Sequence, residues 1–580
     1  MPAWSDARVL VGLALVAGLL LRLVGLSQPP YDDHSFRQTQ TLSTIEAFHA
    51  HGIDLLHPRA IYMGDPGVFV LELPVFQALA ACLYDVFGPH LEVIRILNIL
   101  MGAATTWLLY RITLHFLDRT TAILTALIYW LAPLNIIYQR SMLLDPTAVF
   151  FGLLAFYCLA LLAVGRDSHG ASDIHRTDWF TFIGFVVATW FTAMIKALYL
   201  WPVVLLLAKV LFERRFKVDG WFVRILSVFA VAGVFFLAWN YYAAQVNDAS
   251  PFTRGVKPTS LLGMSDLFTS EFYHKLFSRP KWWLGGAGIL LFPVGLVAAW
   301  LQRQDRVRAA ATGFMILIPP TYLLAFANIN RPHDYYQLII TPFLAVVPAI
   351  GLRWLAARFL SPPAQAKPIR YTAMKWIAIV CATALCGFAL LLSWEKWHDP
   401  AHPRRIFLLL MLPLTCLLLF AGVFAVPQGL LSMGNRMLRR AVVAGVCGLL
   451  ILSSVLTYRM WLQAPKLDRR LLKFEELCTG KVLRGGSAMV FVAQIGDGDA
   501  VFGEIPQYIY AAKLWGFGMA VQDAAGARGY FEKLASAFPR LEYVVFYGTD
   551  CPDWLPSNAF RPAIQDGSNR LYIFQRVSSS

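Results

Sequence analysis

The chain has 580 residues, of which 58% are hydrophobic and only 15% charged. Soluble domains carry roughly 25% charged residues, so this composition excludes a string of water-soluble domains, an ordinary cytosolic enzyme and a disordered or collagen-like chain. Lys and Arg number 50 against 35 Asp and Glu. Basic loops and anionic lipid headgroups explain such an excess in a membrane protein, so no nucleic-acid partner is expected.

Long apolar runs predict an all-α polytopic membrane protein. A helix needs roughly 20 apolar residues to cross a bilayer, and about thirteen segments approach that length. The predicted spans are 8–27, 92–117, 119–138, 145–165, 179–195, 197–212, 221–243, 283–301, 308–327, 337–358, 373–394, 406–426 and 440–461.

Basic clusters predict the orientation, because Lys and Arg gather in cytoplasmic loops. The three clusters are Arg214-Arg215 with Lys217, Arg303 with Arg306 and Arg308, and Arg436 with Arg439 and Arg440. They place the N-terminus in the cytoplasm and the C-terminus outside, provided that segment 68–88 does not cross the membrane. This segment contains Glu72, Pro74 and Asp85, so we expect an amphipathic helix at the interface. A second interfacial helix is expected near 42–51.

Three segments then face outward: the first loop at 28–91, the loop at 244–282, and the region from 462 onward. The last region alternates apolar strands (488–492, 543–547 and 571–574) with helical patterns (505–513 and 525–538). Such alternation is typical of a small α/β domain. We therefore predict a membrane domain at 1–461 and an extracytoplasmic domain at 462–580. Cys478 and Cys551 lie in polar sequence of the latter, and an oxidising compartment would allow them to pair.

The first outer loop begins with the most informative group of polar residues, Asp32, Asp33, His34 and Arg37. A carboxylate close to lipid is partly desolvated, which raises its pKa and suits a general base. Arg37 carries a bidentate fork suited to an anionic headgroup. The alternative is a solvated loop that caps a helix, with Asp33 or Ser35 as the N-cap.

A second polar group follows the third predicted span, where Arg140 and Asp145 face the same side as Asp33. Asp145 could equally cap the next helix, since Pro146 suits a first helical position. Lys196 lies within an apolar stretch, where an ionisable residue is costly and is a functional candidate by default. The alternative for Lys196 is a side chain that reaches the interface from a helix end.

A third polar group spans 328–337 and is again outward. It contains Arg331, His333, Tyr335 and Tyr336. Arg can bind a phosphate through its charge, and His and Tyr through hydrogen bonds. The alternative for the tyrosines is an aromatic belt at the membrane interface.

Four motifs occur in a fixed order: Asp33-His34-Ser35-Phe36-Arg37-Gln38, Gly64-Asp65-Pro66-Gly67 with Glu72-Leu73-Pro74, Arg140 to Asp145, and His333-Asp334-Tyr335-Tyr336. With this set the chain resembles the bacterial branch of the GT-C membrane glycosyltransferases, which are related to protein O-mannosyltransferases and the lipid A aminoarabinose transferase. The likeness covers roughly residues 1–360 and extends to the plan of membrane spans followed by an external C-terminal domain.

The resemblance implies a polyprenyl-phosphate-linked sugar as donor, transfer on the extracytoplasmic face, and inversion at the anomeric carbon. By position, Asp33 matches the catalytic carboxylate of the first loop and Asp145 the second acidic residue. Many family members carry a lysine where this chain has Asp65-Pro66-Gly67. We therefore expect Arg37, Lys196 or Arg331 to contact the donor phosphate in its place.

The predicted mechanism needs a base for the acceptor proton, which we assign to Asp33. It also needs positive charge or hydrogen-bond donors at the departing phosphate. The predicted substrate-binding residues are His34, Arg37, Asp65, Arg140, Lys196, Arg331, His333, Tyr335 and Tyr336. Asp145 could orient the acceptor, hold Arg140, or ligate a divalent metal together with Asp65. No cofactor is required, and no ligand cluster demands a metal.

The acceptor stays open between a lipid, a glycan and a protein, and the bacterial cytoplasmic membrane is the expected location, with the active site and C-terminal domain periplasmic. Two other classes compete. A flippase or transporter would place ionisable residues at mid-depth in several spans, whereas the spans after Trp221 contain almost none. A lipid-linked glycan polymerase or ligase would carry a large outward loop between late spans, whereas the segment 396–405 is short.

Overall fold

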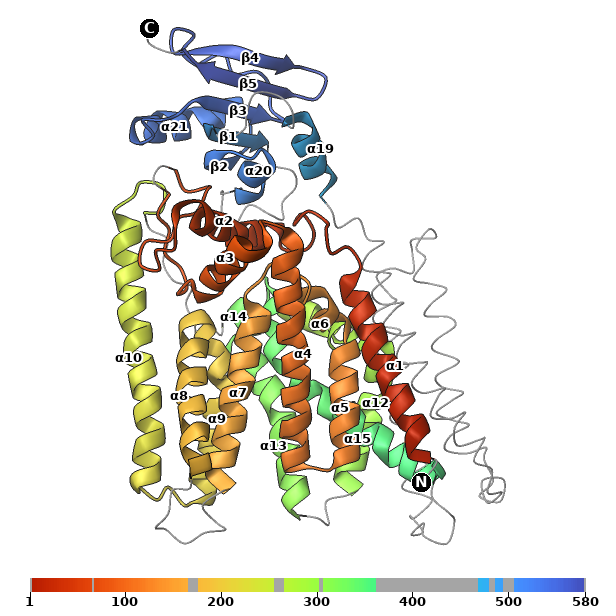
Figure 1. Cartoon of the computed structure of the whole chain (residues 1–580). Helices are drawn as coiled ribbons and strands as arrows, with labels where there is room; N and C mark the ends of the chain where they lie inside the picture. The colour runs from red at the N-terminus through yellow and green to blue at the C-terminus, as the bar shows by residue number, and fades with distance from the viewer. Residues whose placement is uncertain are drawn as a thin grey trace.

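The computed structural model describes residues 3–64, 67–164, 176–254, 265–301, 306–360, 468–478, 486–493 and 505–577. Long helices run between two ends of a bundle, and a small domain that contains a β-sheet lies on one of these ends (Figure 1). The long helices are α1 (Ala3–Leu23), α4 (Leu91–Phe116), α5 (Arg119–Leu131), α7 (Asp145–Val164), α8 (Arg176–Lys196), α9 (Trp201–Glu213), α10 (Gly220–Asp248), α12 (Pro280–Leu301), α13 (Arg306–Ala325) and α15 (Thr341–Leu360).

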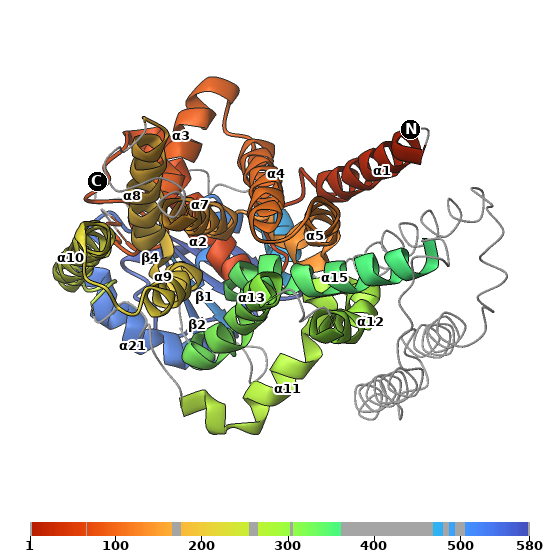
Figure 2. The ribbon, with the colours of Figure 1, turned by 90° about the horizontal axis from the view of Figure 1, so that it is seen from below.

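Seven helical stretches among the described residues are long and apolar enough to cross a membrane. They confirm a polytopic membrane protein, while the predicted spans 373–394, 406–426 and 440–461 lie outside the described residues. α15 belongs to the most buried of the seven stretches and α10 is the most exposed. Seen from below, α7 lies between α4, α8 and α9, and α1 lies at the outside (Figure 2). These packed helices therefore form the core on which the loops of the upper end rest.

The prediction of one continuous span at 119–138 is wrong. The structure ends α5 at Leu131 and starts a separate short helix, α6 (Pro133–Tyr138). Pro133 provides the reason, because a proline forces the residue before it out of the helical region. Ala132 accordingly has an extended backbone with φ −64° and ψ 127°. The break turns the chain so that Tyr138 and Arg140 lie at the upper end of the bundle.

Close packing of α12 against α15 depends on glycine. A Cβ atom on Gly295 would come within 2.0 Å of the carbonyl oxygen of Val347, and one on Gly351 within 2.7 Å of the Gly295 nitrogen. Small residues allow the backbones of membrane helices to approach in this way. The contact holds α15 in place below the segment that carries His333 and Tyr336.

Two helices of the first outer loop, α2 (Ser35–His51) and α3 (Val75–Phe87), lie at the upper end of the bundle and do not run through it (Figure 1). This arrangement agrees with the predicted interfacial helices, although α2 starts earlier than expected. Neither predicted N-cap is correct. His34 occupies that position in a left-handed conformation and makes no side-chain capping bond. His34 is therefore available for contacts elsewhere.

The upper end also carries several short elements from later parts of the chain. They are α11 (Ser270–Ser278), α14 (Ala327–Asn330) and the 3₁₀ turns η1 (Ala197–Leu200), η2 (Ser265–Phe268) and η3 (Asp334–Ile340). η1 separates α8 from α9, which confirms that two helices, not one, cover 176–213. η1 and η3 bring Lys196 and Tyr335 to the same end as α2.

The C-terminal domain is α/β, as predicted. Its sheet has the order β2-β1-β3-β5-β4, formed by β1 (Ser487–Ala493), β2 (Trp515–Val521), β3 (Tyr543–Tyr547), β4 (Phe560–Asp566) and β5 (Leu571–Arg576). β1 pairs in parallel with β2 and β3, whereas β5 pairs antiparallel with β3 and β4. The helices α19 (Arg469–Cys478), α20 (Pro506–Ala511) and α21 (Ala524–Leu534) pack around it. Cys478 and Cys551 are not bonded to each other.

Loop residues from the first outer loop extend the edge of this sheet. The Gly64 N–H donates to the Gly516 carbonyl at 2.8 Å, and the Gly516 N–H donates to the Ile61 carbonyl at 2.7 Å. Trp515 Nε1–H donates to the Gly64 carbonyl at 2.9 Å. Because β2 is an edge strand, its outer hydrogen-bonding groups would otherwise be unpaired. The C-terminal domain thus holds the loop that precedes Asp65.

We expect Trp515→Ala to loosen this connection. The change removes one hydrogen bond and an aromatic contact with His51. A net hydrogen bond contributes about 1 kcal/mol, so the contact between the loop and β2 should open roughly five- to tenfold more often. Hydrogen exchange at the Gly64 and Gly516 amides should rise by that factor. Tyr530→Ala, on the exposed side of α21, is the matched control. Unchanged exchange in Trp515→Ala would show that the loop is held by other contacts.

Candidate active site

Six segments that carry polar side chains lie at the upper end of the bundle, below the C-terminal domain (Figure 1). The segments are the start of α2, the turn before α3, the end of α6, the start of α7, the junction of α8 with η1, and the start of η3. We name the group formed by Asp33, His34, Arg37, Glu72, Tyr138, Asp145, Lys196, His333, Asp334, Tyr335 and Tyr336 the polar cluster.

His34 and Asp334 connect the first outer loop to η3. His34 Nε2 lies 2.8 Å from Asp334 Oδ1, and the Tyr138 hydroxyl donates to the same oxygen at 2.5 Å. His34 holds a left-handed φ of 56°, which is uncommon outside glycine and often marks functional positions. Burial would lower the pKa of His34, but the hydrogen bond and charge of Asp334 raise it. The contact with Asp334 outweighs the burial, so the pKa of His34 lies above its ordinary value.

His333 lies beside His34, with ring centroids 5.9 Å apart. Its pKa shifts in the opposite direction. Burial, together with the positive charges of His34 and Lys196, lowers the pKa of His333 to about 3. His333 is thus a neutral imidazole at pH 7, able to donate or accept one hydrogen bond. Neighbouring groups whose pKa values are driven apart are typical of acid–base sites.

Arg37 forms an ion pair with Glu72 in which one guanidinium nitrogen contacts both carboxylate oxygens. Arg37 Nη2 lies 2.8 and 2.7 Å from the two carboxylate oxygens, and both side chains are about 15% exposed. Arg37 also donates to Gln40, whose amide donates to the Tyr62 hydroxyl at 2.6 Å. Burial raises the pKa of Glu72, but the charge and hydrogen bonds of Arg37 outweigh it and lower the pKa. Glu72 is therefore ionised and fixes the position of Arg37.

Asp145 and Lys196 form a second, more deeply buried ion pair. Lys196 Nζ and the Tyr199 hydroxyl each donate to Asp145 Oδ1 at 2.6 Å. The Asp145 side chain is 0% exposed and that of Lys196 6%. The Lys196 ammonium lies 4.0 Å from the ring centre of Tyr336 and 4.6 Å from that of Tyr335. The lysine thus faces the tyrosines as well as the carboxylate.

The two ion pairs lie around the same tyrosines. Arg37 is within electrostatic range of Tyr335 and Tyr336, and Glu72 within range of Lys196. Two cations therefore lie within electrostatic range of the tyrosine pair, and each forms an ion pair with a carboxylate. Asp145 Oδ2 has no hydrogen-bond partner among the described residues, so this carboxylate is held mainly by Lys196 and Tyr199.

Asp33 differs from Asp145 in its exposure. Asp33 is half-buried and Asp145 fully buried. The carbonyl oxygen of Asp33 accepts a hydrogen bond from Gln38 Nε2 at 2.9 Å, which fixes the backbone, and its carboxylate lies within electrostatic range of His34. Both aspartates predicted to be catalytic lie within electrostatic range of His34, but only Asp33 is partly exposed.

Arg140 lies behind the first loop. Its Nη1 donates to the Val24 carbonyl at 2.7 Å, and its Nη2 lies 3.7 Å from Asp32 Oδ2. Burial raises the pKa of Asp32, while Arg140 opposes this effect. Arg140 is 3% exposed. It thus supports the loop that carries Asp33, and its role in substrate binding stays a prediction.

Arg331 binds other loop residues. Its Nε lies 2.6 Å from Asp266 and its Nη1 2.7 Å from Glu271. Arg279, which the sequence analysis did not select, instead donates to the Asn330 and Arg331 carbonyls and lies within electrostatic range of Asp334. Two ion pairs thus connect Arg331 to η2 and α11.

Asp65 lies outside the described residues. Across the ranges that the structure describes, no group of three His, Cys, Asp or Glu residues could hold a metal ion. The divalent metal with Asp65 and Asp145 as ligands stays a prediction.

Sequence analysis missed Glu72, Tyr138 and Asp334 as site residues, although Glu72 and Asp334 lie within the motifs it quoted. The signal for Asp334 was its place next to His333. Its contact with His34 joins residues 300 positions apart, and such a pairing cannot be derived from one sequence.

Comparisons with known proteins agree with this fold. A family model described as dolichyl-phosphate-mannose-protein mannosyltransferase matches residues 87–247. A crystal structure of ArnT from Cupriavidus metallidurans in the apo state is similar over 99% of both chains, with a TM-score of 0.59 and 16% identity. The chain has the GT-C glycosyltransferase fold.

A second ArnT structure from the same organism, bound to undecaprenyl phosphate, is similar over 98% of both chains, with a TM-score of 0.59 and 14% identity. A comparison with curated protein sequences gave no significant match. The matched family and the GT-C fold support an enzyme, a membrane glycosyltransferase that takes its sugar from a lipid carrier.

Proposed function

We propose that this chain transfers a sugar from a polyprenyl-phosphate carrier to the hydroxyl group of a lipid, glycan or protein acceptor, with inversion. The reaction takes place at the polar cluster, on the periplasmic side of a bacterial cytoplasmic membrane, with the N-terminus in the cytoplasm. The observation that carries the proposal is that Arg37 and Lys196, each paired with a carboxylate, both lie within electrostatic range of Tyr335 and Tyr336.

The donor phosphate is the group that these cations suit. A departing phosphate gains negative charge, and fixed cations in a partly buried site stabilise this charge without reorganising. Glu72 and Asp145 hold Arg37 and Lys196 in place before a donor binds. His34 and the neutral His333 add hydrogen-bond donors at the same place. One ArnT structure is bound to undecaprenyl phosphate. We expect this polyprenyl phosphate to bind at the polar cluster of the present chain.

Asp33 is the proposed general base. It takes the proton of the acceptor hydroxyl while that oxygen attacks the anomeric carbon and the carbon–phosphate oxygen bond breaks. The electron pair of the broken bond stays with the lipid phosphate, next to Arg37 and Lys196. Asp145 suits this role less because it is fully buried and neutralises Lys196. It is a positioning residue in this mechanism.

Binding of the lipid product tests the site without knowledge of the sugar. Every donor of this class leaves the same polyprenyl phosphate, so purified protein can be titrated with undecaprenyl phosphate. We expect Arg37→Gln to weaken binding about 10- to 100-fold, because a hydrogen bond to a charged group contributes about 1.5–3 kcal/mol.

Arg331→Gln is the matched control, since Arg331 is engaged by Asp266 and Glu271. We expect its affinity to change by less than about threefold, consistent with the small contribution of an exposed ion pair. Arg37→Lys keeps the charge and checks that a loss is not due to misfolding. Equal losses in both glutamine variants, or none in Arg37→Gln, would contradict the proposed phosphate site.

A further inference from the structure

The upper end of α10 contacts the stretch of the first outer loop that carries Glu72 (Figure 1). The Val70 N–H donates to Asn247 Oδ1 at 2.9 Å, and Asn247 Nδ2 donates to the Val70 carbonyl at 2.8 Å. Trp239 lies about two turns earlier on the same helix, and its Nε1–H donates to the Leu71 carbonyl at 2.8 Å. Three hydrogen bonds from α10 thus hold the two residues that precede Glu72.

Asn247 is an unusual residue for this helix. Five of the 29 residues of α10, all of which the structure describes, are buried, and Asn247 is the one polar residue among them. Asn247 is 2% exposed and Val70 1%. A buried backbone N–H and C=O both need partners, and a side-chain amide supplies an acceptor and a donor on the same carbon atom. Asn247 therefore satisfies both backbone groups of Val70.

The residue after Glu72 is held by a different helix. The Leu73 N–H donates to the Met194 carbonyl at 3.2 Å. Met194 lies in the last turn of α8, which ends at Lys196. The backbone around Glu72 is thus fixed by α10 before this residue and by α8 after it. Both ion pairs of the polar cluster are connected to this short stretch, one through Glu72 itself and the other through the helix end that carries Lys196.

We infer, on the basis of the proposed function, that Asn247 and Trp239 are positioning residues for the donor phosphate. They fix the backbone that places Glu72, and the Glu72 carboxylate holds Arg37. A cation stabilises a departing phosphate best when it is already in place before the reaction. The helix α10, which is the most exposed of the seven apolar stretches, thereby orders a cation of the polar cluster without contacting the substrate.

The test is a double-mutant cycle with the purified full-length protein, titrated with undecaprenyl phosphate. Asn247→Ala should weaken binding about fivefold, the effect of one net hydrogen bond. In the Arg37→Gln background the same change should have almost no effect, because the group that Asn247 positions is already absent. Trp239→Phe keeps an aromatic ring and loses the donor. It is a milder second variant and should show the same dependence on Arg37.

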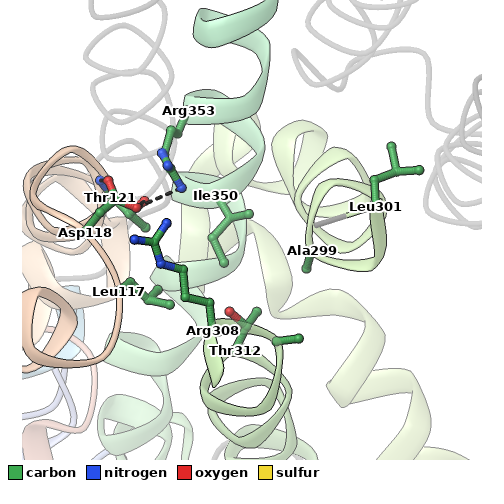
Figure 3. A pocket seen from close by; sticks show the side chains of 10 residues that line it. Leu117, Asp118, Thr121, Ala299, Leu301, Arg308, Thr312, Ile350 and Arg353 are labelled. Carbon is green, nitrogen blue, oxygen red and sulfur yellow. Dashed lines mark hydrogen bonds and ion pairs between the residues drawn. The ribbon is translucent and has the colours of Figure 1, made fainter. Parts of the chain in front are cut away.

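Asn240→Ala is the matched control, since Asn240 is half-buried and its amide donates to the Phe236 carbonyl of its own helix at 2.8 Å. Arg353→Gln is a control at the opposite end of the bundle, where Arg353 pairs with Asp118 in the pocket of Figure 3. Both controls should keep the affinity of the wild type. An equal loss in either control would overturn the inference, as would an equal effect of Asn247→Ala with and without Arg37, because a general loss of stability would then explain the result.

Hydrogen exchange without ligand separates this inference from the proposed function. Asn247→Ala should raise exchange at the Leu73 amide, on the far side of Glu72, about fivefold, whereas Asn240→Ala should not. Unchanged exchange would show that α10 does not hold Glu72, and the inference would be wrong. If exchange rises but Arg37→Gln binds undecaprenyl phosphate as the wild type does, the proposed phosphate site fails, and with it the role of α10 at the phosphate, while the support of Glu72 by α10 stands.

Discussion

Asp33→Asn is expected to lower kcat by about 10²- to 10⁴-fold, the usual contribution of a general base. Asparagine has nearly the same shape and preserves the backbone bond from Gln38, but it cannot accept the acceptor proton. The affinity for undecaprenyl phosphate should stay unchanged, because Arg37 and Lys196 are untouched. Steady-state transfer rates, with the melting temperature measured in parallel, check this prediction.

Asp32→Asn is the matched control for this change. Asp32 is adjacent in sequence but faces Arg140 and Gln38 behind the loop. Its replacement should lower stability more than the rate of the chemical step. If Asp33→Asn were as active as the wild type, the assignment of the base would be wrong, and Asp32 and Asp145 would be the next candidates.

Lys196→Met is expected to lower the free energy of unfolding by about 3–5 kcal/mol, because removal of one partner of a buried ion pair leaves a buried charge uncompensated. The charge left behind is Asp145, which is 0% exposed. Adding Asp145→Asn to Lys196→Met should restore part of this loss, since no uncompensated charge then remains. Reversible unfolding in detergent gives the free energy of unfolding of the wild type, Lys196→Met and the double variant.

Lys209→Met provides the comparison at the surface. Lys209 pairs with Glu213 at 2.7 Å, but the two side chains are 23% and 54% exposed. Such pairs contribute about 0–1 kcal/mol, so the change should be small. If Lys196→Met were no more destabilising than Lys209→Met, the Asp145–Lys196 pair would not be the buried element described here.

The apolar pattern predicted most helices that the structure describes. It placed the break at η1 correctly because Lys196 interrupts the apolar run. The predicted span at 119–138 overlooked Pro133, which divides α5 from α6. In the C-terminal domain, β2 escaped prediction because it contains Gly516 and Gly518, which are poor strand formers. β4 contains Pro562 and lies at the edge of the sheet, where its alternation is weak.

For the candidate site, the sequence predicted which polar residues lie together better than it predicted how they pair. Asp145 and Lys196 were each selected, one at a helix start and one in an apolar run, but their mutual contact depends on the packing of α7 against α8. Arg37 was expected to be directed at a phosphate, and its attachment to Glu72 was not foreseen. Arg331 has the right residue type and position in sequence, yet α11 supplies carboxylate partners for it. Tertiary contacts determine all three outcomes.

The most direct test of the central claim is turnover of a lipid-linked sugar. The purified wild type is incubated with a panel of radiolabelled undecaprenyl-phosphate sugars, and release of undecaprenyl phosphate is measured together with the anomeric configuration of the product. We predict release from at least one donor, with inversion, and loss of this activity in a folded Asp33→Asn variant. A wild-type protein that binds undecaprenyl phosphate yet consumes none of the donors, or a product that retains the donor configuration, would contradict the account.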